Sequence, residues 1–187
     1  MRAFVAVRLD DRSRAALRAE IDHLRRVAPD VAWVAAENLH VTLKFLGRVE
    51  TARLRDVAAG LEEAVRVARA FDIEVRGLGA FPSPSRPRVV WAGIAAGRDP
   101  MNALAERVEQ ALAPLGFPRE ARAFSPHVTL GRVREPRRDP RLSRLIEAAE
   151  NLEFGVVRVD AVWLMRSDLS TRGARYSEIA VVSVSAP

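Results

Sequence analysis

The residue types that are scarce in this sequence set the first limits on its function. Its 187 residues include no cysteine, one lysine, one tyrosine, three histidines and four threonines. The lack of cysteine excludes disulfide bonds, thiolate metal sites and a cysteine nucleophile. No apolar run is long enough to span a membrane, and the N-terminal apolar run is too short for a signal peptide. We therefore expect a cytoplasmic protein with no membrane partner.

Basic residues outnumber acidic ones, by 30 to 24, which gives a net charge of +6 and a pI of about 11.1. Such a balance favours polyanionic partners such as RNA or nucleotides. However, Lys44 is the only lysine and alanine is abundant, which is typical of a codon bias that raises the pI of unrelated proteins. The charge therefore permits an RNA partner, but it also fits a solvated, arginine-rich surface.

Hydrophobic periodicity predicts alternating strands and amphipathic helices. The expected strands cover residues 3–9, 39–46, 71–79, 88–95, 127–133, 154–165 and 175–184. The expected helices cover residues 12–27 and 52–69, then one from Asp99-Pro100 to Gly116 and one from Asp139-Pro140 onward. In the last two, the aspartate would cap free N–H groups and the proline would occupy the first helical position.

The order of these elements predicts an α+β fold with helices on one side of mainly antiparallel sheets. The length fits one domain, or two small lobes sharing a core, and an apolar content of 49% is enough for a sizeable core. No long linker divides the chain. The proline-rich segment 81–88 and the charged segment 134–141 are expected to be surface loops.

The tetrapeptide HVTL occurs twice, beginning at His40 and at His127. Side chains alternate along a strand, so His40 and Thr42 share one face, about 6–7 Å apart. His127 and Thr129 do the same. The valines and leucines can then be buried while both polar pairs face solvent or a cleft. If the two strands lie in facing halves of the fold, the two pairs converge on one point.

Two histidines and two threonines suit phosphodiester hydrolysis. Imidazole titrates near neutral pH, so one ring can accept a proton from water while the other donates one to a leaving oxygen. These groups must lie on opposite sides of phosphorus because the nucleophile and leaving group are roughly in line. Threonine hydroxyls can stabilise the charge on the non-bridging oxygens. This chemistry requires no metal, and a cyclic phosphate is an apt substrate.

Other interpretations of the repeat remain open. A single HxT sequence is typical of any half-buried strand, and the repeat could reflect a duplication in which both histidines are structural. A zinc site is a further alternative, but zinc usually takes three or four protein ligands. Only two of the three histidines lie in the repeated motif, so the sequence does not offer enough matched ligands.

The motifs resemble those of the two-histidine phosphoesterase superfamily, which is defined by two HxT/S motifs. More narrowly, the chain resembles the RNA 2′,3′-cyclic phosphodiesterases, also named 2′-5′ RNA ligases. The resemblance covers nearly the whole chain and is carried by MRAFVAVRL (1–9), WVAAENLHVTLKFLG (33–47), RPRVVWAG (86–93), FSPHVTLGR (124–132) and LMRSDLSTRGARYSEIA (164–180). All four motif positions agree with the family pattern.

The resemblance implies a bilobal α+β fold in which residues 1–187 form one domain. Two mainly antiparallel sheets would be related by a pseudo-twofold axis around a central cleft, with the helices on the outer faces. Each lobe would carry one HxT motif, at residues 40–42 and 127–129.

The implied reaction is hydrolysis of a 2′,3′-cyclic phosphate at an RNA end to a 2′-phosphate, without metal or other cofactor. On this basis His40 is the expected general acid for the 3′ oxygen and His127 the expected general base for water. Thr42 and Thr129 would hold the phosphoryl oxygens. The symmetry of the motifs also allows the reverse assignment. The expected partner is RNA or an oligonucleotide with a cyclic phosphate end, and we expect a monomer with no obligatory protein partner.

Four further residues are candidate substrate contacts. Alternation places Lys44 on the motif face, where it would contact phosphate or be a surface charge. Phe45 and Arg132 follow the two motifs at equivalent positions, and the resemblance implies base stacking and a phosphate or base contact. Strict alternation turns both away from the histidines, so a bulge or the end of the strand must redirect them. Core packing of Phe45 and a surface role for Arg132 are the alternatives. Tyr176 either lines the cleft or packs on a sheet.

Two other functions are compatible with the same residues. The protein could bind nucleotides or RNA without catalysis. It could also be a phosphodiesterase for 2′,5′-linked oligonucleotides or for a cyclic phosphate on ADP-ribose. These substrates would use the same four motif residues, so the sequence does not separate them.

Overall fold

The computed structural model describes residues 1–135, 138–171 and 173–186. The strands are β1 (Arg2–Arg8), β2 (Val31–Trp33), β3 (His40–Arg48), β4 (Phe71–Phe81), β5 (Val89–Ile94), β6 (His127–Val133), β7 (Glu153–Val159), β8 (Ala161–Ser170) and β9 (Gly173–Ser183). The helices are α1 (Asp11–Val27), α2 (Leu54–Val65), α3 (Arg98–Leu112) and α4 (Pro140–Ala148), with short 3-10 turns η1 (Ala36–Asn38), η2 (Thr51–Arg53) and η3 (Ala113–Leu115).

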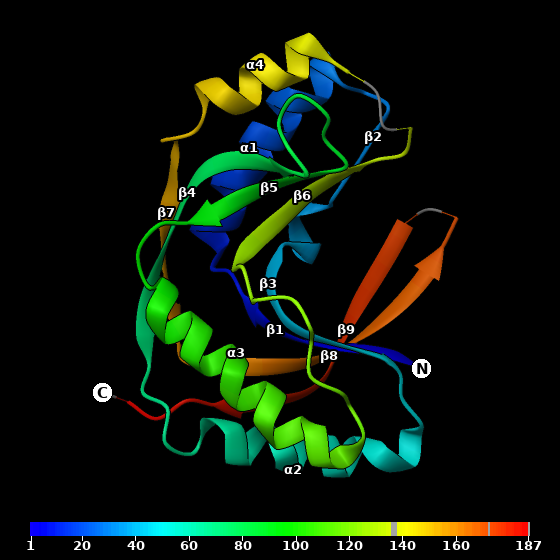
Figure 1. Cartoon of the computed structure of the whole chain (residues 1–187), viewed down its shortest axis with the longest axis vertical. Coiled ribbons are helices and arrows are strands. Elements are labelled where there is room, and N and C mark those ends of the chain that lie inside the picture. The colour runs from blue at the N-terminus through cyan, green and yellow to red at the C-terminus, as the bar shows by residue number, and fades with distance from the viewer. Residues whose placement is uncertain (136–137, 172, 187) are drawn as a thin grey trace.

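The strands form one curled sheet in the order β7-β4-β5-β6-β3-β1-β8-β9, with β2 paired to β6 (Figure 1). Every pairing between these strands is antiparallel. The α+β class is therefore confirmed. The two expected sheets are instead joined into one, because β3 and β6 pair at Val41 and Val128. The division into two lobes related by a pseudo-twofold axis stays a prediction.

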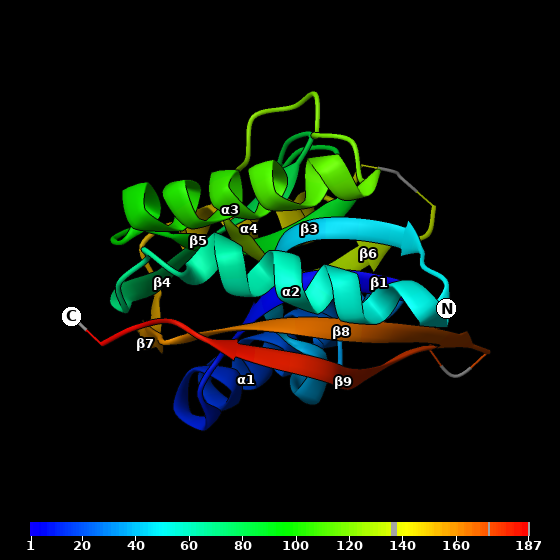
Figure 2. The same cartoon turned by 90° about the horizontal axis from the view of Figure 1, so that it is seen from below.

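The helices cover the sheet in two pairs. Helices α2 and α3 pack against each other, with α3 against β3 and α2 against β9, whereas α1 packs on β7 and α4 on β4 (Figure 2). The helices pack on the sheet because each has an apolar face. In α1 this face is formed by Leu17, Ile21 and Leu24, which are buried. No helix in the described part of the chain is long and apolar enough to cross a membrane.

Strand β1 is buried on both faces, and this defines two packing layers. Ala3, Val5 and Val7 belong to the main core beneath the helices. Phe4 belongs to a small separate cluster with Ala6 and Met165. Because side chains alternate along a strand, this small cluster lies on the face of the sheet opposite the main core.

Several predicted elements differ in the structure. The expected strand 154–165 breaks at Asp160, so that β7 pairs with β4 at one edge of the sheet and β8 pairs with β1 and β9 near the other. Strand β2 was not expected, because three residues carry little periodicity. Helix α2 is shorter than the predicted 52–69.

Of the two predicted aspartate caps, one is confirmed and one is wrong. Asp139 caps α4 by accepting hydrogen bonds from the backbone N–H groups of the next turn. In α3 the cap position is Gly97, in a left-handed conformation with φ of 79°, and Asp99 lies inside the first turn. The expected loop 134–141 includes residues 136–137, and the closing family segment includes Arg172; these lie outside the described residues.

Candidate active site

The two motif strands are neighbours in the sheet, and their pairing brings the motifs together. Val41 of β3 is the antiparallel partner of Val128 of β6, and neither valine has any exposed surface. The residues on either side of each valine point to the opposite face. Extended by one residue, the antiparallel register sets His40 across from Thr129 and Thr42 across from His127. All four motif residues therefore gather on one face around this valine pair.

Each histidine ring is oriented by a backbone carbonyl two residues earlier in the chain. His40 Nδ1 lies 2.7 Å from the carbonyl oxygen of Asn38, and His127 Nδ1 lies 2.7 Å from that of Ser125. A carbonyl only accepts, so Nδ1 carries the proton and Nε2 of the neutral ring is free to accept one. His40 Nε2 lies 2.9 Å from Thr42 Oγ1, whose hydroxyl donates to it.

Both imidazoles are held toward the neutral form. Burial lowers the pKa of His40 below its usual value, the hydrogen bond to Asn38 opposes this, and charge on His127 lowers it further. Burial also lowers the pKa of His127, with Ser125 opposing and the guanidinium of Arg132 adding to the decrease. A neutral imidazole is the form that can accept a proton from water.

Aromatic side chains pack around both histidines. The ring of His40 lies 4.8 Å from that of Phe4 and 5.4 Å from that of Tyr176, the latter edge-on at 81°. The ring of His127 lies 5.1 Å from that of Phe81, also edge-on at 85°. These contacts restrict ring rotation and exclude water, which is the cause of the lowered pKa of each histidine.

Trp91 lies beside the second histidine, with ring centroids 6.4 Å apart, and sequence analysis did not identify it. Sequence reasoning also missed Phe4 and Phe81. No local pattern marks these three aromatics, because their positions depend on which strands pair beside β3 and β6. The equal spacing of Asn38 and Ser125 before each histidine is a signal that sequence analysis could have used.

A β-bulge follows each motif at the same position. The register of β3 against β1 shifts at Leu43, and that of β6 against β5 shifts at Leu130. An extra residue in one strand turns the residues after it to the opposite face. The bulges that the sequence required for Phe45 and Arg132 to face the histidines are thus present.

The structure places Phe45, Arg132 and Tyr176 around the histidines. Phe45 is 61% exposed, and its ring lies 6.3 Å from that of Phe4. The charge of Arg132 acts on His127 and on Tyr176, whose pKa burial raises and Arg132 lowers. Core packing of Phe45 is therefore excluded.

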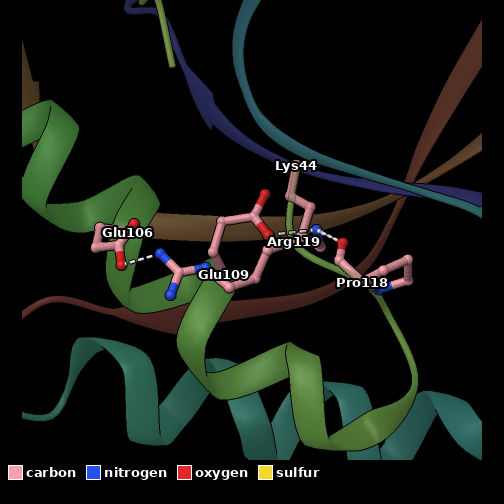
Figure 3. Close-up of polar contacts among 5 residues, drawn as sticks. All are labelled: Lys44, Glu106, Glu109, Pro118 and Arg119. Atoms are coloured by element: carbon pink, nitrogen blue, oxygen red, sulfur yellow. Dashed lines mark hydrogen bonds and ion pairs between the residues drawn. The ribbon is translucent and has the colours of Figure 1, made fainter. Parts of the chain in front are cut away.

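Lys44 is the exception, and both expectations for it are wrong. The bulge at Leu43 turns Lys44 away from the motif face, and the residue is only 3% exposed. Its ammonium group donates to Glu109 Oε2 at 2.6 Å and to the carbonyl oxygen of Pro118 at 2.8 Å (Figure 3). Lys44 is thus neither a phosphate contact nor a surface charge.

A small hollow lies beside His40. It has a volume of about 100 Å³ and is bordered by Phe4, Arg8, Asn38 and Tyr176 among others. Aromatic and polar groups both line it, as is typical of ligand sites. Among residues 1–135, 138–171 and 173–186, no three His, Cys, Asp or Glu side chains come together in a way that could hold a metal ion.

Comparisons with known sequences point to one family. A sequence model of the 2′-5′ RNA ligase superfamily matches residues 13–171. The RNA 2′,3′-cyclic phosphodiesterase of Methanothermobacter thermautotrophicus is 37% identical over 181 residues, covering 97% of each chain. The protein of the same name from Thermus thermophilus is 31% identical to this chain. The match covers 98% of this chain and 90% of that protein.

Solved structures agree with these matches. The crystal structure of TT0787 from Thermus thermophilus superimposes with a TM-score of 0.83 at 29% identity, covering 100% of this chain and 99% of that one. The crystal structure of E. coli LigT complexed with 3′-AMP has a TM-score of 0.74 at 26% identity, covering 98% and 97% of the two chains. With its paired HVTL motifs on adjacent strands, the chain belongs to the 2′-5′ RNA ligase superfamily.

Proposed function

We propose that this protein hydrolyses the 2′,3′-cyclic phosphate at an RNA end to a 2′-phosphate, by general acid and base catalysis without a metal. The observation that carries the proposal is the gathering of His40, Thr42, His127 and Thr129 around the Val41–Val128 pair. Nδ1 of each histidine is held by a backbone carbonyl, so that Nε2 is the nitrogen that faces the reaction, and in His40 it accepts from Thr42 before substrate binds. The names of the relatives supply the substrate class.

In the proposed reaction His127 Nε2 accepts a proton from water as the water oxygen bonds to phosphorus. The bond from phosphorus to the 3′ oxygen breaks, and His40, which acts here in its doubly protonated form, donates the proton on Nε2 to that oxygen and returns to the neutral ring. Attack and departure occur on opposite sides of phosphorus, which is why two histidines are needed. Thr42 and Thr129 donate hydrogen bonds to the non-bridging oxygens, where negative charge increases in the transition state.

The pKa of each histidine is lowered, mainly by burial, so these shifts do not distinguish the acid from the base. The position of the hollow supports His40 as the acid and His127 as the base. The hollow lies beside His40, and the departing 3′ oxygen belongs to the terminal ribose, which needs more room than water. We propose that this ribose occupies the hollow and that a base stacks on exposed Phe45.

The test is product analysis with an oligonucleotide that ends in a 2′,3′-cyclic phosphate. The wild-type protein should yield a 2′-phosphate end, and turnover should survive dialysis against EDTA. His40→Ala and His127→Ala should each abolish turnover while the thermal unfolding transition is retained. His23→Ala is the matched control, because His23 lies on α1 with a 44% exposed side chain. Full activity in either motif variant would overturn the mechanism.

The same experiment addresses the alternative functions. Nucleotide binding without product over long incubation would identify a binding module. Turnover of 2′,5′-linked oligonucleotides or of a cyclic phosphate on ADP-ribose, with the RNA end left intact, would assign a different substrate. We also propose that the protein acts as a monomer, since one chain supplies both motifs.

A further inference from the structure

A buried ion pair lies behind the first motif strand. Lys44 Nζ lies 2.6 Å from Glu109 Oε2, and the two side chains are only 1% and 11% exposed. Removing two charges from water is costly unless the geometry is good and the remaining hydrogen-bonding groups have partners. Here the ammonium group has a second acceptor, the carbonyl oxygen of Pro118 at 2.8 Å (Figure 3). The single lysine of the chain therefore makes two interior contacts.

The contact of Lys44 with Pro118 joins the parts of the chain that carry the two motifs, whereas its contact with Glu109 attaches β3 to α3. Lys44 follows Thr42 by two residues on β3. Pro118 lies in the connection between η3 and β6, and this connection leads directly to His127. Near its end, the carbonyl of Ser125 orients the His127 ring. The ammonium group thus fixes one end of a segment, residues 118–126, whose other end holds the second histidine.

Other contacts hold the same connection, but they attach it to helices. The guanidinium of Arg53 donates to the carbonyl of Leu115 and lies 5.3 Å from the Phe117 ring. The guanidinium of Arg119 donates to Glu106 on α3, with both side chains about half exposed (Figure 3). The contacts of Arg53 attach the connection to η2, and the half-exposed pair of Arg119 adds only a weak attachment to α3, whereas Lys44 attaches the connection to the motif strand.

The second motif strand has no room for a corresponding side chain. The residue after the bulge in β6 is Gly131, and a Cβ there would lie 2.6 Å from Cε3 of Trp33. Strand β2 therefore covers this position, while the equivalent position in β3 holds Lys44 and faces α3. The two otherwise matching bulges differ in this respect, and only the first has a charged group that reaches the other motif's connection.

We propose that Lys44 is a positioning residue that couples the two halves of the active site, by fixing the segment before His127 relative to the strand that carries His40. In-line phosphoryl transfer depends on the relative placement of acid and base, and a misplacement of about 1 Å can cost about 10²-fold in rate. The kinetic part of this inference rests on the proposed function. The orientation of His127 is a property of the protein alone and can be measured without substrate.

The experiment compares Lys44→Met with Arg119→Gln, which removes the neighbouring exposed ion pair. For each variant kcat and KM are measured with a cyclic-phosphate oligonucleotide, and the imidazoles of His40 and His127 are titrated by NMR. Lys44→Met is expected to lower kcat by roughly 10²-fold with KM little changed, and to alter the titration of His127 more than that of His40. Arg119→Gln should resemble the wild type in every measurement.

A folded Lys44→Met protein with wild-type kcat and wild-type His127 titration would overturn the proposal and leave the ion pair a structural feature only. If Lys44→Met does not fold, the double variant Lys44→Met/Glu109→Leu decides by the same two measurements, because it removes the contact with Pro118 without leaving an unpaired buried charge. Absence of turnover in the wild type would contradict the proposed function. The His127 titration would still test the coupling in that case.

Discussion

Val41 and Val128 are direct cross-strand partners with no exposed surface, and each lies between a histidine and a threonine of its own motif. This pair is where the first and second halves of the sheet meet, since β3 and β6 are adjacent in the strand order. The apolar side of each motif therefore joins the sheet, while the polar side forms the candidate site. Packing on one face and chemistry on the other depend on the same two residues.

Val128→Ala should lower both stability and activity. Loss of two buried methyl groups is expected to reduce the free energy of unfolding by about 2 kcal/mol, and loosening of the strand pair should reduce turnover. Chemical denaturation and steady-state kinetics measure the two effects. Val156→Ala is the control, because Val156 is 61% exposed and should change stability by no more than about 0.5 kcal/mol. Equal stability of the two variants would contradict the importance of the pair.

His40 should make stability depend on pH. Its pKa is lowered in the folded protein, mainly by burial, so the unfolded chain binds a proton more readily. The contribution of His40 to the free energy of unfolding should therefore be complete above the unfolded pKa of about 6.5. It should decrease as the pH falls toward the pKa of the folded state. Urea denaturation between pH 8 and pH 5 measures this. In His40→Asn the free energy of unfolding should decrease less as the pH falls. A pH dependence identical to that of the wild type would contradict a lowered pKa of His40 in the folded protein.

Local periodicity was sufficient to predict that each histidine shares a face with the threonine of its own motif, because this depends only on the alternation within each strand. It failed for Lys44, two residues farther along. The bulge at Leu43 that turns Lys44 inward is set by pairing with β1, which lies far away in the sequence. The buried charge then depends on Glu109 and Pro118, which lie more than 60 residues away.

The fold shows the same limit. The apolar run 154–165 reads as one strand, but Asp160 divides it, and β7 and β8 lie in opposite halves of the sheet. An apolar pattern indicates that a segment is buried, but it does not indicate which strand the segment pairs with. Phe4 and Trp91 were missed for the same reason, since only the strand order brings them beside the motifs, whereas Tyr176 was among the predicted candidates.

Phe45→Ala should separate binding from stability. The side chain is 61% exposed, so its loss should change the free energy of unfolding by no more than about 0.5 kcal/mol. If a base stacks on it, KM should rise roughly tenfold, in line with about 1–3 kcal/mol per stacked base, while kcat changes little. Steady-state kinetics on a cyclic-phosphate oligonucleotide measure both constants. Leu169→Ala, also exposed, is the control, and an unchanged KM in Phe45→Ala would exclude base stacking.

Arg132→Gln should change both the titration of His127 and the rate. The guanidinium lowers the pKa of His127, so its removal should raise that pKa and move the acidic limb of the pH–rate profile to higher pH. If Arg132 contacts a phosphoryl oxygen, as the family resemblance implies, its loss should also reduce kcat/KM by roughly 10²-fold, as for removal of one oxyanion donor. NMR titration and a pH–rate profile measure these effects. Arg158→Gln, which removes an exposed ion pair between β7 and β4, should leave both unchanged. Burial is the main cause of the lowered pKa of His127 and the guanidinium adds to it, so an unshifted His127 titration in Arg132→Gln would contradict this added effect of the arginine.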